Sequence, residues 1–110
     1  MPFRPVLAID ALPPGAMTGL LVGTRKVLLV NIAGEVHAYE DRCAHQAVDL
    51  SDGHLDGAIL TCWAHQWQYD VVRGVGVNPV PVKMRRFAVR VDDGRIFVDV
   101  DGFEASEPPP

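Results

Sequence analysis

The stretch Cys43-Ala44-His45 and, sixteen residues later, the stretch Cys62-Trp63-Ala64-His65 each place one thiol and one imidazole on a short loop. Together they offer two sulfur and two nitrogen donors, a set that suits transition metals. A single Cys/His pair arises easily by chance in a protein core, but two matching pairs do not. The sequence therefore predicts a metal centre formed by Cys43, His45, Cys62 and His65.

The order of the four donors favours iron and sulfide over zinc. Zinc modules usually pair like with like, as two cysteines followed by two histidines, whereas each loop here mixes one of each. In a 2Fe–2S cluster with two histidine ligands, the cysteines hold one iron and the histidines hold the other, so mixed loops are expected. A zinc-stapled β module for protein interaction is the alternative. A catalytic Cys–His pair would need only one of the two sets.

Bulk composition bounds the remaining possibilities. The 110 residues suffice for one domain, and the longest strongly apolar run, Val27 to Ala33, is too short to span a bilayer. The start of the chain lacks the pattern of a signal peptide, and both cysteines belong to the predicted centre, which favours a reducing, cytoplasmic location. A net charge of −4 argues against nucleic acid and is compatible with docking on a basic partner or with solubility alone.

The rest of the chain is typical of an all-β fold with hairpin turns at Ala33-Gly34 and Asp93-Gly94. A turn-rich middle section, about residues 41–82, predicts a small insert of short strands and loops, and residues 102–110 predict a flexible tail. Runs rich in Val, Ile, Leu and Phe between turn residues predict six strands: Arg4–Ile9, Gly19–Val22, Lys26–Ile32, Glu35–Tyr39, Arg85–Val91 and Arg95–Val100.

Residues 43–53 and 60–70 resemble the two sequence boxes of Rieske proteins, and the likeness continues through Asn78-Pro79 to Gly94. This resemblance implies a single Rieske-like domain over residues 1–110. Its scaffold would be an antiparallel β-sandwich or partial barrel, with a small subdomain that binds a Rieske-type 2Fe–2S cluster. The resemblance also implies that Cys43, His45, Cys62 and His65 are the cluster ligands.

Within that family the chain is most similar to ferredoxins of toluene-type, four-component diiron monooxygenases, through His45-Gln46, residues 64–67 and residues 74–79. This likeness implies a monomeric electron carrier, not an enzyme, between an NADH-dependent flavin or iron–sulfur reductase and the diiron hydroxylase of an aromatic or alkene monooxygenase. A ferredoxin of a ring-hydroxylating dioxygenase is the alternative. Such ferredoxins more often carry Pro and Gly where Trp63 and Gln66 stand. An accessory Rieske-like subunit of a reductase is a further alternative.

Residues around the predicted ligands bear on the redox potential and on docking. The resemblance implies that Val48 and Ala64 replace the disulfide cysteines of respiratory Rieske proteins, and that Trp67 replaces a serine that donates to a bridging sulfide. The Tyr69 hydroxyl either donates to a ligand sulfur or lies at the surface. Pro81 is expected to stiffen a cover beside the cluster.

Other polar residues have plainer interpretations. Gln46, Gln66 and Trp67 are candidates for the docking surface around the histidines, although packing under the second loop is the preferred role for Trp67. We expect His37 and His54, which lie outside both boxes, to be surface residues, and the Arg85-Arg86 pair to be a solvated strand edge.

The reduction potential provides a first test. Because Trp67 replaces the serine donor, the added charge of the reduced cluster is less stabilised, and we expect a midpoint potential toward the lower end of the Rieske range, of order −150 mV. Voltammetry of the purified protein measures it. A strongly positive value, as in respiratory Rieske proteins, would contradict this interpretation.

Overall fold

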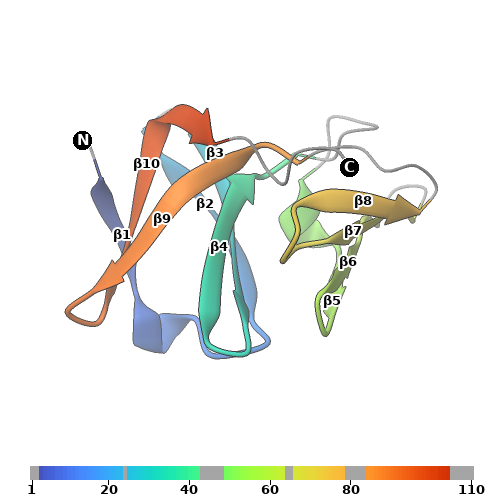
Figure 1. Ribbon diagram of the computed structural model, residues 1–110, viewed down its shortest axis with the longest axis horizontal. Coiled ribbons are helices and arrows are strands. Elements are labelled where there is room, and N and C mark those ends of the chain that lie inside the picture. Colours follow the sequence, from blue (N-terminus) through green and yellow to red (C-terminus); the bar gives the residue numbers. More distant parts are fainter. Residues whose placement is uncertain (1–2, 24, 43–48, 64–65, 79–83, 105–110) are drawn as a thin grey trace.

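Two antiparallel sheets lie side by side in the computed structural model, which describes residues 3–23, 25–42, 49–63, 66–78 and 84–104 (Figure 1). Within these ranges the chain forms strands β1 to β10 and two short 3-10 helices, η1 (Ile9–Ala11) and η2 (Leu50–Asp52). Neither helix is long and apolar enough to cross a membrane. The all-β prediction is therefore confirmed.

The larger sheet has the strand order β1-β10-β9-β4-β3-β2 and curves into a nearly closed barrel. Its predicted hairpin turns are confirmed: Ala33 and Gly34 have φ of 55° and 93°, and Asp93 and Gly94 have φ of 51° and 74°. Two consecutive left-handed residues match the twist of the flanking strands. The strands are β1 (Arg4–Ala8), β2 (Met17–Val22), β3 (Arg25–Ile32), β4 (Glu35–Glu40), β9 (Arg86–Asp92) and β10 (Arg95–Glu104).

The smaller sheet is the predicted insert, with the order β5-β6-β7-β8. Its strands are β5 (His54–Asp56), β6 (Ile59–Thr61), β7 (Gln68–Asp70) and β8 (Val75–Asn78). The sequence indicated neither β5 nor β8 as a strand. β5 is only three residues long, and β8 lies in a Gly/Pro-rich run, so neither shows the alternation on which a prediction depends.

β10 extends beyond its predicted end at Val100. The strand continues to Glu104, which pairs with Arg86 of β9 after an irregularity in register. Residues 102–104 of the expected tail therefore belong to the sheet, and residues 105–110 lie outside the described chain. The end was missed because Asp101 and Gly102 are poor strand residues in isolation.

Two apolar cores hold the sheets. The first lies within the barrel and contains Val27, Leu29, Phe87 and Ile96 among other buried residues. The second joins both sheets, because residues of β3 and β4 pack with residues of the smaller sheet and its loops. Its buried members are Leu28, Val30, Tyr39, Leu50, Leu60, Cys62, Tyr69, Val71 and Met84.

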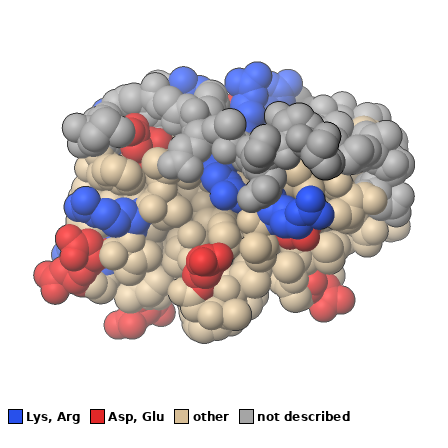
Figure 2. Space-filling view, viewed as in Figure 1, with Lys and Arg blue, Asp and Glu red and all other residues tan. Residues whose placement is uncertain are grey.

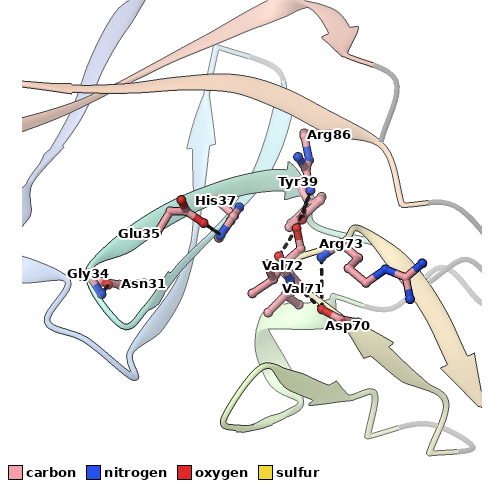
Figure 3. Close-up of polar contacts among 10 residues, drawn as sticks. All are labelled: Asn31, Gly34, Glu35, His37, Tyr39, Asp70, Val71, Val72, Arg73 and Arg86. Atoms are coloured by element: carbon pink, nitrogen blue, oxygen red, sulfur yellow. Dashed lines mark hydrogen bonds and ion pairs between the residues drawn. The ribbon is translucent and has the colours of Figure 1, made fainter. Parts of the chain in front are cut away.

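A polar clamp between Tyr39 of β4 and Arg86 of β9 also ties the two sheets together (Figure 3). The Tyr39 hydroxyl donates to the carbonyl of Val71 at 2.6 Å, and the Arg86 guanidinium donates both to that hydroxyl and to the carbonyl of Val72, each at 2.8 Å. Burial raises the pKa of Tyr39, so the hydroxyl keeps its proton. Arg86 is therefore no solvated edge residue: the sequence did not show that β4 and the β7–β8 turn face it.

His37 is buried, contrary to the expectation that it is a surface residue. Its ring stacks beside Tyr39, and Nε2 lies 3.0 Å from a carboxylate oxygen of Glu35, although the ring is not aligned for a hydrogen bond. Burial lowers the pKa of His37, with Glu35 acting in the opposite direction. The register of β4 places this histidine under the clamp, which the alternation of the strand alone did not show.

The clamp can be tested with one arginine variant and a matched control. Arg86→Met removes a part-buried hydrogen bond to the Tyr39 hydroxyl and an exposed one to the carbonyl of Val72, and we expect it to lower the free energy of unfolding by about 1–3 kcal/mol. Arg95→Met, at an exposed arginine of β10, should change it by less than about 0.5 kcal/mol. Urea denaturation of both variants measures the difference. Equal stabilities would show that the clamp contributes nothing.

Candidate metal centre

The register of the smaller sheet gathers the predicted site segments at one end. Thr61 pairs with His54 on one side and with Gln68 on the other, and Gln68 pairs with Asn78. These four paired residues form one row across the sheet. The first residues of β5 and β7 and the last residues of β6 and β8 lie in this row. The chain from the first Cys/His pair enters this end, the second pair lies in the β6–β7 loop, and the proline segment leaves from it.

The β6–β7 loop, residues 62–67, begins in the core and rises to the surface. Cys62 is completely buried, and its backbone N–H donates to the carbonyl of Trp67 at 2.7 Å, which closes the base of the loop. Gln66 has a left-handed φ of 55°, which turns the chain back toward β7. Trp63, the residue after the buried thiol, is 59% exposed.

The flanks of the first Cys/His pair are tied together by Asp41 and Ser51. The buried carboxylate of Asp41 accepts hydrogen bonds from the backbone N–H of Ser51 at 2.8 Å and from its hydroxyl at 2.6 Å. Nearby, the Lys26 ammonium lies 2.8 Å from a carboxylate oxygen of Asp49, and this hydrogen bond raises the pKa of Lys26. The residues before and after the first Cys/His pair, Asp41 and Ser51, therefore lie side by side.

Two glycines permit this close packing. A Cβ at Gly19 of β2 would collide with the Asp41 carboxylate and the Ser51 hydroxyl, and a Cβ at Gly53 would collide with the carbonyl of Thr61. The second contact lets the end of the first loop lie directly against β6, one residue before Cys62. The sequence did not indicate the contact between Asp41 and Ser51, because no spacing rule pairs these two residues.

Three of the predicted site residues are described by the structure. Cys62 and Tyr69 share the second core, and Tyr69 is 1% exposed, which excludes the alternative with its hydroxyl at the surface. Trp67 is half-buried and packs against the same core, as the packing interpretation predicted. His54 is exposed, as expected. The remaining predicted site residues lie outside the described chain: Cys43, His45, Gln46, His65 and Pro81.

The described part of the site suits an iron–sulfur cluster. Among the described residues, no three His, Cys, Asp or Glu side chains gather around one point, because only one of the four predicted ligands is among them. That ligand, Cys62, is a thiol buried among apolar residues at a closed loop base, an environment that excludes water. Thiolates are the preferred ligands of iron in such clusters, which supply one-electron redox chemistry when bound.

Comparisons with known proteins agree with this donor chemistry. The family model of the Rieske 2Fe-2S domain matches residues 3–96. The chain is 41% identical over 97 residues to the ferredoxin component of the alkene monooxygenase system of Xanthobacter autotrophicus, covering 87% of this chain and 80% of that protein. It is 30% identical to the biphenyl dioxygenase ferredoxin subunit of a Pseudomonas species, covering 90% and 93%.

A solved structure extends the likeness to the fold. A chain in the complex of reduced oxygenase and oxidised ferredoxin of carbazole 1,9a-dioxygenase superposes with a TM-score of 0.79 at 27% identity. The match covers 98% of this chain and 96% of that one. The two sheets described above therefore form the Rieske fold.

The tie between Asp41 and Ser51 can be tested through metal retention. Ser51→Ala removes one hydrogen bond to a buried carboxylate, and we expect a loss of about 1–2 kcal/mol of stability together with faster release of iron to a chelator. Thr18→Ala on β2 removes a hydroxyl outside this contact and serves as the control. Iron-release rates that are the same in both variants would show that the tie does not protect the site.

Proposed function

The chain belongs to the Rieske 2Fe-2S family and is a ferredoxin component of an oxygenase system, and from this premise we propose that it serves a diiron monooxygenase. It carries single electrons on a Rieske-type cluster and does not itself oxidise the substrate. In this proposal it accepts electrons from an NADH-dependent flavin reductase. It passes them to the diiron hydroxylase of an aromatic or alkene monooxygenase.

The observation that carries this proposal is the 41% identity to an alkene monooxygenase ferredoxin, compared with 30% for the biphenyl dioxygenase subunit. Two residues of the second box support the same choice. Trp63 and Gln66 occupy positions where dioxygenase ferredoxins more often carry Pro and Gly. A dioxygenase partner is nevertheless the second candidate, because dioxygenase ferredoxins cover as much of the chain.

We assign the ligands in accordance with the two mixed loops. Cys43 and Cys62 hold one iron, and His45 and His65 hold the other. The burial of Cys62 and the exposure of Trp63 support this arrangement, since the loop runs from core to surface as it approaches His65. Electrons then leave through the histidine side, while the protein around Cys62 keeps water from the cysteine side.

The ligand assignment also supports a cellular location for the carrier, and the second core supports a single domain. With both cysteines used as ligands, the chain needs no oxidising compartment, and we place the carrier in the cytoplasm. The second core spans both sheets, which supports one cooperative domain with the cluster-binding subdomain at about residues 41–82.

Stopped-flow mixing distinguishes the two candidate partners. The reduced holoprotein is mixed with the diiron hydroxylase of an alkene monooxygenase and, separately, with the terminal oxygenase of an aromatic dioxygenase. We expect reoxidation at least about tenfold faster with the diiron enzyme, because Trp63 and Gln66 of the second box would adapt the docking surface to that partner. Cys62→Ser, which removes a ligand, is the control and should be colourless and inactive. Faster delivery to the dioxygenase would reverse the assignment.

A further inference from the structure

Three segments of the sequence that contain or adjoin the proposed ligands carry no charged residue. Residues 43–48, 57–69 and 74–82 contain no Asp, Glu, Lys or Arg, although charged residues make up 22% of the chain. At that average about six charges would be expected in segments of this total length. The pairing of Thr61 with Gln68 and of Gln68 with Asn78 brings the described parts of residues 57–69 and 74–82 together.

Acidic side chains lie elsewhere. In the view of Figure 2, Asp and Glu gather chiefly along the lower edge of the molecule, where Figure 1 places the hairpin turns at residues 33–34, 57–58 and 93–94. The β5–β6 turn is at the opposite end of its hairpin from Thr61 and Cys62. The negative net charge therefore does not apply to the described residues of the second ligand loop and its flanking strands, 59–63 and 66–69, which carry no charged side chain.

Apolar side chains are exposed at this uncharged end. Trp63 in the β6–β7 loop is 59% exposed, and Val77 on the edge strand β8 is 48% exposed. Trp63 is the largest of the exposed hydrophobic side chains in the described chain, and it directly follows a proposed ligand. Removing the apolar area of this indole from water against a partner surface would stabilise the complex.

We propose that Trp63 anchors the docking of this carrier by inserting into an apolar depression on the oxygenase component. The inference rests on the proposed function and adds the contact through which the carrier would bind the oxygenase. Interface centres are depleted of charged residues and enriched in aromatic ones, and tryptophan is among the residues that most often dominate binding energy. The described part of the uncharged segments has this composition: Trp63 is its exposed aromatic residue, whereas Trp67 is half-buried and Tyr69 is buried.

The oxygenase is the occupant that the observations favour. A chain of this fold, 27% identical, is part of a solved complex between an oxygenase and a ferredoxin. A carrier must also bring its cluster close to the acceptor, and Trp63 is separated from the proposed ligand His65 by one residue. Docking through Trp63 would therefore bring the segment that carries His65 close to the acceptor.

This docking mode has a kinetic signature. Because the contact centre carries no charge, attraction between complementary charges contributes little, and association should change by less than about threefold between low and high salt. Docking of an acidic carrier on a basic patch would instead weaken steeply with salt.

The experiment is stopped-flow electron delivery from the reduced holoprotein to the oxygenase, with the Kd taken from the dependence of the rate on oxygenase concentration. We expect Trp63→Ala to raise the Kd about tenfold or more and Trp63→Phe to raise it less. Val77→Ser should raise it severalfold. Val91→Ser, at an exposed valine near the distal turn of β9, is the control and should leave the Kd unchanged.

Iron content, visible spectrum and midpoint potential of each variant show whether the cluster is intact. Trp63→Ala with an intact cluster and an unchanged Kd would overturn the inference while leaving the proposed function in place. If Trp63→Ala does not load iron, the Kd of Val77→Ser is used instead, and an unchanged Kd would overturn the inference. Steep salt dependence, or loss of a dimer of this chain in Trp63→Ala, would also overturn it. Absence of delivery from the unmodified protein to any oxygenase would refute the proposed function itself.

Discussion

The antiparallel register of four very short strands is the constraint on which the site depends. Thr61 has a partner on each side, and through Gln68 the row reaches Asn78. This row brings segments from three parts of the sequence to one end of the sheet. A slip of one residue would turn every side chain of a strand to the opposite face, and Tyr69 would leave the core that it shares with Cys62.

Strands of three or four residues do not hold such a register by themselves, since isolated small sheets are marginal in water. The larger sheet supplies the missing stabilisation. Leu28, Val30 and Tyr39 complete the core around Cys62. Arg86 fixes the β7–β8 turn by donating to the carbonyl of Val72 and to the Tyr39 hydroxyl, which in turn donates to the carbonyl of Val71. The barrel therefore acts as a rigid support that sets the geometry of a subdomain with little regular structure of its own.

The contrast between the two sheets explains how far the sequence predicted the structure. The barrel strands are runs rich in Val, Ile, Leu and Phe, and two of their hairpins close with pairs of left-handed residues, so the strand positions could be predicted within a few residues. β8 could not, because its strand character comes from pairing with β7 and not from its Gly-rich sequence. The donor pairs were evident from local spacing. The contact between Asp41 and Ser51 forms only when the chain folds, as does that between Tyr39 and Arg86. No local sequence pattern predicts such contacts.

Separation of charge from the contact surface has a consequence for an electron carrier. Such a protein must bind one partner, release it and bind another, so its contact must be small and its affinity modest. A single exposed indole provides contact energy without committing the surface to a partner of one charge. The same indole would promote self-association if nothing opposed it. A net charge of −4, with acidic side chains gathered at the hairpin end, makes identical carriers repel one another. The sequence left the acidity open between docking on a basic partner and solubility alone, and keeping copies of the carrier apart is the explanation that fits the proposed uncharged contact.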